Sequence, residues 1–281
     1  MNGRAIAPAA GTVLNALATG IGSAFAIDSE ITATVQLTPD GPITGEIADA
    51  PDADTRLIER CVELVVERFG DGHGGTVRTQ SEIPMAAGLK SSSAAANATV
   101  LATLDALDAS CPREDAARIG VTAARDTGVT VTGAFDDASA SMLGGLTITD
   151  NARDELLDHD TVDWDVLVWT PNERAFSTDA DVDRCKTIAP MADLVADLAM
   201  AGDYGRAMTV NGLAYSAALG FPTEPLITAM PHTRGVTLSG TGPSFVAVGD
   251  QSELEQVQER WNTYDGNTWL TTTRTDGAQR K

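Results

Sequence analysis

The chain has 281 residues, of which 43% are hydrophobic, enough for one large domain or two of ordinary size with a real core. Forty acidic residues against nineteen basic ones give a formal net charge of -21, which argues against nucleic acid or an anionic membrane surface as the natural partner. No run of about eighteen apolar residues occurs, which excludes a transmembrane helix.

The basic residues are mostly arginine, because only Lys90, Lys186 and Lys281 are lysine. An acidic, alanine-rich chain that is poor in lysine and aromatic residues is typical of proteins from halophilic archaea, whose cytosol holds molar salt. At 1 M salt the Debye length falls to about 3 Å, so repulsion within such a surface is largely screened. We therefore predict a halophilic protein that needs high salt to stay folded.

The cysteines and the N-terminus both bear on the cellular compartment. Three cysteines without CxxC spacing support neither a disulfide framework nor a zinc site, so a reducing compartment fits. The alanine-rich N-terminus imitates a signal peptide, but Pro8, Gly11 and Asn15 interrupt its apolar stretch. We expect a cytoplasmic protein, with a secreted acidic domain as the alternative.

Hydrophobic periodicity and turn residues predict the following elements in chain order. We expect a strand at 31–37, a helix near 57–68 and a strand at 76–84. A long helix should begin after residue 90 and continue to Cys111-Pro112, and a second helix should cover 113–126. Residues 128–150 should form, in order, a strand, an acidic loop, a short helix, a glycine turn and a strand. After a polar stretch at 151–163 come a strand at 164–169, helices at 188–202 and 204–219, strand, glycine loop and strand at 235–250, a helix at 252–262 and a strand at 268–275. The mixed order predicts an α+β fold, and the polar stretch predicts two domains, 1–155 and 156–281.

The stretch "EIPMAAGLKSSSAAAN" at residues 82–97 places a glycine, a lysine and three serines at the start of a helix. A helix N-terminus presents free backbone N–H groups and the positive end of a dipole, so it suits an anion. Here Gly88 permits the backbone to approach a bound anion closely, Lys90 can reach a phosphate, and the serines can cap the helix or bind magnesium. Ordinary helix capping is the alternative interpretation. The spacing is not that of a Walker A loop, so any nucleotide would be bound on a different fold.

Two motifs together resemble the GHMP small-molecule kinases. "PMAAGLKSSSAAA" is similar to their phosphate-binding motif, and "TLSGTGPSFVAV" at 237–248 is similar to their C-terminal glycine motif. The N-terminal "AIAPAAGTVLNALATGIGSAFAID" and the central "TGAFDDASAS" narrow the resemblance to archaeal-type shikimate kinases. The resemblance implies an N-terminal α+β domain packed on a ferredoxin-like C-terminal domain, and transfer of the γ-phosphoryl group of ATP to the 3-hydroxyl of shikimate, with Mg²⁺.

The resemblance also implies roles for particular residues. Asp136 matches the catalytic base and would contact the substrate, Lys90 would assist catalysis, and Asp137 stands where relatives carry asparagine or glutamine. Two adjacent carboxylates in a tight site are expected to raise each other's pKa. The ATP phosphates would meet Pro84, Ala86, Ala87, Gly88, Leu89, Lys90, Ser91, Ser92, Ser93 and Ala94.

Metal and substrate residues follow by the same resemblance. Ser92 would bind magnesium, with Asp126 as the nearest carboxylate partner, although its spacing differs by one residue from the family pattern. The substrate would be bound by Asn15, Ser23, Arg234 and the glycine loop Gly240, Thr241 and Gly242, with Arg234 or Arg125 as partner of its carboxylate.

Shikimate and ATP are the expected partners of a monomer or homodimer. Homoserine kinase or another GHMP small-molecule kinase is the nearest alternative. A binding protein that has lost catalysis is a third.

Overall fold

The structure is a computed structural model that describes residues 1–82, 87–130, 133–172 and 180–281. Among these residues, seven strands form one sheet, in the order β11-β1-β2-β4-β3 with β5 and β6 attached through β2, and four form another, in the order β10-β7-β9-β8. The first sheet comprises β1 (Asn2–Leu14), β2 (Ile21–Thr38), β3 (Ile43–Ile47), β4 (Gly74–Ser81), β5 (Leu146–Asp150), β6 (Glu155–Asp160) and β11 (Gln279–Arg280). The second comprises β7 (Asp165–Thr170), β8 (Gly235–Leu238), β9 (Phe245–Gly249) and β10 (Asn267–Thr272).

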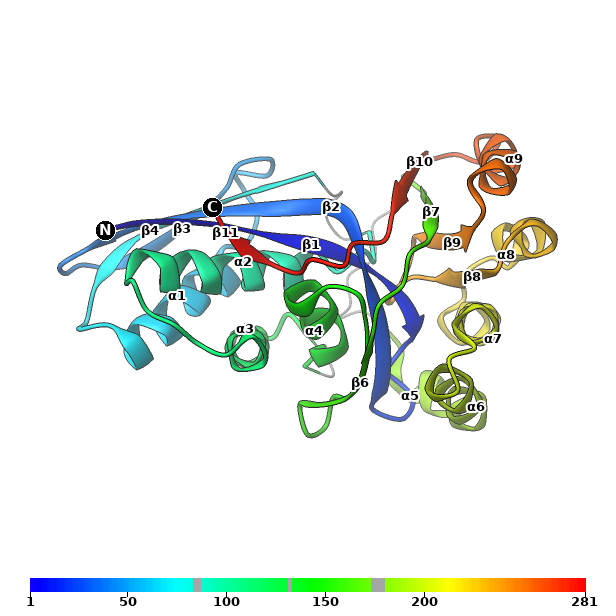
Figure 1. The fold of residues 1–281 in the computed structure, drawn as a ribbon, viewed down its shortest axis with the longest axis horizontal. Helices are drawn as coiled ribbons and strands as arrows, with labels where there is room; N and C mark the ends of the chain where they lie inside the picture. The colour runs from blue at the N-terminus through cyan, green and yellow to red at the C-terminus, as the bar shows by residue number, and fades with distance from the viewer. Residues whose placement is uncertain (83–86, 131–132, 173–179) are drawn as a thin grey trace.

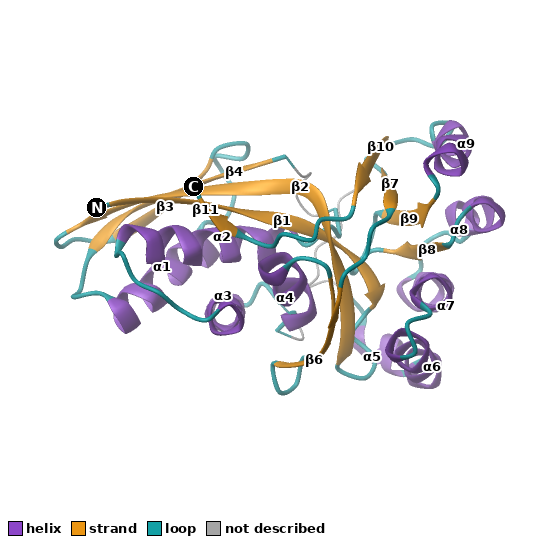
Figure 2. Cartoon of the chain, viewed as in Figure 1, coloured by secondary structure: helices purple, strands orange, loops and turns teal. Residues whose placement is uncertain are grey.

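Helices cover one face of each sheet (Figures 1 and 2). On the first sheet lie α1 (Arg56–Phe69), α2 (Ser91–Ala106) and α4 (Phe135–Leu143), and α3 (Arg113–Thr127) packs against these three helices. Beside the second lie α5 (Val182–Lys186), α6 (Ala189–Met200), α7 (Tyr204–Leu219), α8 (Glu224–Ala229), the 3-10 turn η2 (Met230–His232) and α9 (Gln251–Trp261). The α+β prediction is confirmed. No helix in the described part of the chain is long and apolar enough to cross a membrane.

The N-terminal strand β1 is an element that the sequence analysis did not predict. Its alanines and glycines have low strand preference, but they are buried beneath α2, and a Cβ on Gly3 would overlap the Ala102 carbonyl oxygen. Small residues are needed here because a helix lies directly on the strand. Helix α2 itself ends at Ala106, earlier than the Cys111-Pro112 stop that was predicted.

The segment after β10 returns to the first sheet (Figure 1). The amide of Gly145 donates to the Arg274 carbonyl, the amide of Ala278 donates to the Ser141 carbonyl, and β11 pairs with β1 at Ala5. Strand β6 also begins at the predicted boundary and pairs with β5. The first sheet therefore includes residues on both sides of residue 155, and the two-domain division with that boundary stays a prediction.

Candidate active site

A cavity of about 960 Å³ lies where the start of α2, the start of α4, the end of β1 and the glycine loop after β8 meet. Among the predicted residues, its wall includes Asn15, Gly88, Lys90, Ser91, Ser92, Ser93, Asp136, Asp137, Gly240 and Thr241. The structure thus brings together segments that are about 150 residues apart in the chain, as the two-motif interpretation requires. Pro84 and Ala86 lie outside the described residues.

The phosphate-loop prediction rests on the turn that precedes α2. Gly88 and Lys90 both have positive φ, of 76° and 63°, and α2 begins immediately afterwards at Ser91. The first-turn amides have no partner within the helix, which makes this end of α2 suitable for an anion. Ala87, Leu89 and Ala94 are buried and do not line the cavity, so their predicted contact with ATP stays a prediction.

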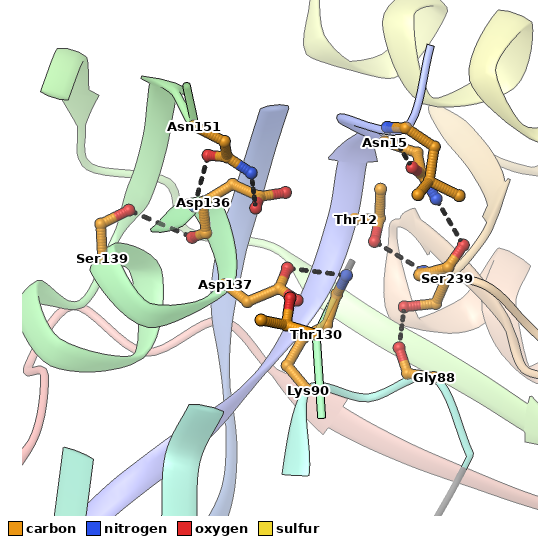
Figure 3. Close-up of polar contacts among 12 residues, drawn as sticks. Thr12, Asn15, Gly88, Lys90, Thr130, Asp136, Asp137, Ser139, Asn151 and Ser239 are labelled. Carbon is orange, nitrogen blue, oxygen red and sulfur yellow. Dashed lines mark hydrogen bonds and ion pairs between the residues drawn. The ribbon is translucent and has the colours of Figure 1, made fainter. Parts of the chain in front are cut away.

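The glycine loop after β8 packs directly against this turn (Figure 3). The Ser239 hydroxyl donates to the Gly88 carbonyl at 2.9 Å, and the Ser244 amide donates to the Ala87 carbonyl at 3.3 Å. A Cβ on Gly88 would overlap the Ser239 carbonyl oxygen, so glycine is required for both its positive φ and this close approach. Gly242 does not line the cavity; its Cα faces the Phe221 ring instead.

The end of β1 fixes the glycine loop from the other side. The Gly240 amide donates to the Thr12 hydroxyl at 2.8 Å, and the Asn15 side-chain amide donates to the Gly240 carbonyl at 2.8 Å. The Asn15 side-chain oxygen accepts a hydrogen bond from the Leu17 amide at 2.9 Å. Asn15, which was predicted to bind substrate, lines the cavity, and in this structure its amide group holds the glycine loop.

Asp136 and Asp137 lie in the first turn of α4 rather than in an acidic loop, so that part of the secondary-structure prediction is wrong. The Lys90 ammonium is 2.7 Å from the Asp137 carboxylate, and the exposed fractions of the two side chains are 8% and 15% (Figure 3). Burial, followed by the charge of Asp136, raises the pKa of Asp137 to about 7, although Lys90 acts in the opposite direction. Lys90 therefore connects the phosphate loop, in which it stands, to the Asp137 carboxylate at the start of α4.

Asp136 is 4% exposed and is held by a residue that the sequence analysis missed. The Asn151 side chain donates to the Asp136 carboxylate at 2.7 Å and accepts from the Asp136 backbone amide at 3.0 Å. Gly22 leaves room for the carboxylate, because a Cβ there would lie 2.6 Å from its carbon atom. No local sequence signal marks Asn151, which follows the end of β5 and reaches Asp136 only through the fold.

Four further predicted residues, besides Gly242 and the three buried residues of the phosphate loop, do not line the cavity. Asp126 accepts a hydrogen bond from Arg60 at 2.8 Å on the exposed side of α3, and Arg234 pairs with Asp250. Ser23 is buried within β2 outside the cavity wall.

Arg125 also does not line the cavity, since it forms two hydrogen bonds with Asp154 at 2.6 and 2.7 Å. Among the described residues that line the cavity, the cations are Lys90 and Arg56, and Arg56 was not predicted.

Comparison with known proteins identifies relatives of the whole chain and a family domain that contains the phosphate loop and Asp136. Residues 56–145 match the GHMP kinases N terminal domain. A shikimate kinase from Halobacterium salinarum is 64% identical over 99% of both chains, and one from Methanosarcina mazei is 51% identical over 94% of this chain and 90% of the relative. The crystal structure of homoserine kinase from Cytophaga hutchinsonii matches with a TM-score of 0.78 at 16% identity, covering 100% of this chain and 97% of that one, which shows the fold alone.

The fold, the cavity and the matched domain define an ATP-dependent small-molecule kinase of the GHMP class. The 64% and 51% identities over nearly the whole chain then identify the family within that class. It belongs to the shikimate kinase family of archaea.

Proposed function

We propose that the protein transfers the γ-phosphoryl group of ATP to the 3-hydroxyl of shikimate, a step towards chorismate and the aromatic amino acids. The observation that carries this proposal is the 64% identity, over 99% of both chains, to a protein named shikimate kinase. The cavity supports it, because it combines a helix N-terminus for phosphates with buried carboxylates that can accept a hydroxyl proton.

Catalysis of phosphoryl transfer is mainly positioning and charge neutralisation, and different residues of the chain would have different roles in it. The α2 amides and Lys90 would hold the phosphates, and the glycine loop, anchored to Gly88, would close the site over them. Asp136 would accept the proton of the attacking hydroxyl, because Asn151 fixes its carboxylate at the cavity wall.

The hydroxyls at the start of α2 fit a magnesium ion, which prefers oxygen ligands and keeps several waters. Ser92 would provide the protein oxygen, and the bound ion would neutralise charge on the phosphates. Asp126, the predicted partner of Ser92, accepts a hydrogen bond from Arg60 and does not line the cavity.

The substrate is tested by ADP release from the purified protein in molar KCl with Mg-ATP and one acceptor per well. Shikimate, homoserine, mevalonate and galactose form the panel. We expect release with shikimate alone. Release with homoserine instead would keep the kinase class but overturn the acceptor, and no release by folded protein in any well would favour a binding protein.

High salt should be required for folding, and we propose a halophilic, cytoplasmic enzyme on the strength of the -21 net charge. The midpoint of thermal unfolding should rise most steeply between about 0.1 and about 1 M KCl, where the Debye length falls from about 10 Å to about 3 Å and repulsion among surface carboxylates is screened. Circular dichroism at a series of KCl concentrations measures this. A midpoint that does not change would refute the salt requirement. Light scattering in the same buffers would distinguish a monomer from a homodimer.

A further inference from the structure

Asn151 makes a two-point contact with Asp136 that fixes both the backbone and the carboxylate of that residue (Figure 3). It is 1% exposed and stands immediately after β5. Its side-chain oxygen faces the Asp136 backbone amide at 3.0 Å, and because that N–H can only donate, the atom facing it must be the oxygen. The amide nitrogen is therefore the atom that faces the Asp136 carboxylate at 2.7 Å.

The orientation of Asn151 is itself fixed from three sides. The Thr149 hydroxyl donates to the same side-chain oxygen at 2.8 Å. The Asn151 backbone amide donates to the Gly20 carbonyl at 2.9 Å, and its carbonyl accepts from the Arg125 guanidinium at 3.2 Å. Arg125, which was predicted as a substrate ligand, thus helps to hold the backbone of Asn151. An amide that is held in this way loses little further freedom when it orients the carboxylate.

We propose that Asn151 is a positioning residue for phosphoryl transfer, acting through Asp136. Its N–H donates to one carboxylate oxygen, while its carbonyl oxygen satisfies a first-turn amide of α4 and so fixes where the helix begins. The other carboxylate oxygen lies against Gly22, the position on β2 where a side chain would displace it. This inference rests on the proposed function, since it assigns Asn151 through the base of that reaction.

The test is a double-mutant cycle between Asn151 and Asp136 in molar KCl. Asn151→Ala should lower kcat by about 100-fold, the effect of an approximately 1 Å misplacement, with the KM values for ATP and the acceptor changed less than about threefold. In an Asp136→Asn background the same change should lower kcat by less than about twofold, because the group through which Asn151 acts is already lost.

Asn151→Asp provides a second variant of nearly the same shape, in case removal of the buried amide impairs folding. It keeps an oxygen for the Asp136 backbone amide, but the new carboxyl group either repels Asp136 or shares a proton with it, so kcat should again fall. Ser139→Ala is the matched control. It removes a buried hydrogen bond to the Asp136 backbone carbonyl, not to the carboxylate, and should retain most of kcat.

Either of two results would overturn the proposal. One is a kcat close to wild type in both Asn151 variants. The other is a loss that multiplies fully with Asp136→Asn, which would indicate a purely structural role. Unfolding curves identify variants that are merely unstable. The wild-type rate with each acceptor reports on the proposed function, and the ratio of variant to wild type reports on Asn151, so the two failures are distinguishable.

Discussion

Replacing Asp136 with asparagine should lower kcat by about 10²- to 10⁴-fold while leaving the affinity for ATP nearly unchanged. The reason is that a buried carboxylate at the cavity wall can accept a hydroxyl proton in the chemical step, whereas an amide of the same shape cannot. Steady-state kinetics with the acceptor in excess, together with nucleotide titration, separate the two quantities.

Asp126→Asn is the matched control for this change. Asp126 pairs with Arg60 on the exposed side of α3, so its loss should change kcat less than about twofold. An equally large loss in Asp126→Asn would support Asp126 as the metal ligand after all. Full activity of Asp136→Asn, with loss in Asp137→Asn, would move the base to Asp137.

Lys90→Met should impair both nucleotide binding and turnover. It should also lower the free energy of unfolding relative to wild type, by an amount that grows as the pH rises. Removing Lys90 leaves Asp137 without its partner at 2.7 Å, in a buried position where an unpaired charge is costly. The pKa of Asp137, already raised to about 7 by burial and by Asp136, should rise further in the variant.

The sign of the pH effect follows from the protonation of Asp137 in each protein. Below about pH 7 the group is protonated in the folded form of both proteins, so the variant should be about as stable as wild type. Above that pH the wild type ionises beside Lys90 and the variant does not, so the variant's deficit should grow by about 1.4 kcal/mol per pH unit. Denaturant unfolding at pH 6 and pH 9 in molar KCl measures the difference. The double variant Lys90→Met with Asp137→Asn should show no such growth, and a deficit equal at both pH values would contradict the ion-pair explanation.

The parts of the site that could be predicted from sequence are those in which backbone chemistry restricts the residue types. Gly88 must combine a positive φ with close approach of another loop, and Lys90 with three serines stands at a helix start, so these patterns are visible locally. Their meeting with the glycine loop needed the resemblance to a known family, because no local rule joins segments so far apart.

The residues that sequence reasoning misplaced are mostly charged groups whose partners come from other elements. Most arginines in the described part of this acidic chain lie within 4 Å of a carboxylate, and Arg125 and Arg234 both form such ion pairs away from the cavity. Asn151 and the strand β1 were missed for a related reason. An asparagine after a strand and a run of alanines have no distinctive pattern, and their roles arise only from packing against Asp136 and α2.

The pairing of β11 with β1 bears on how the polypeptide is made. Strand β1 leaves the ribosome long before Gln279 and Arg280, the two residues of β11 that pair with it at Ile6 and Ala5. Until then β1 has an unpaired edge, which is where nascent chains associate wrongly. The N-terminal half should therefore reach its final form only after translation has passed residue 280, and fragments that lack this segment should depend on chaperones.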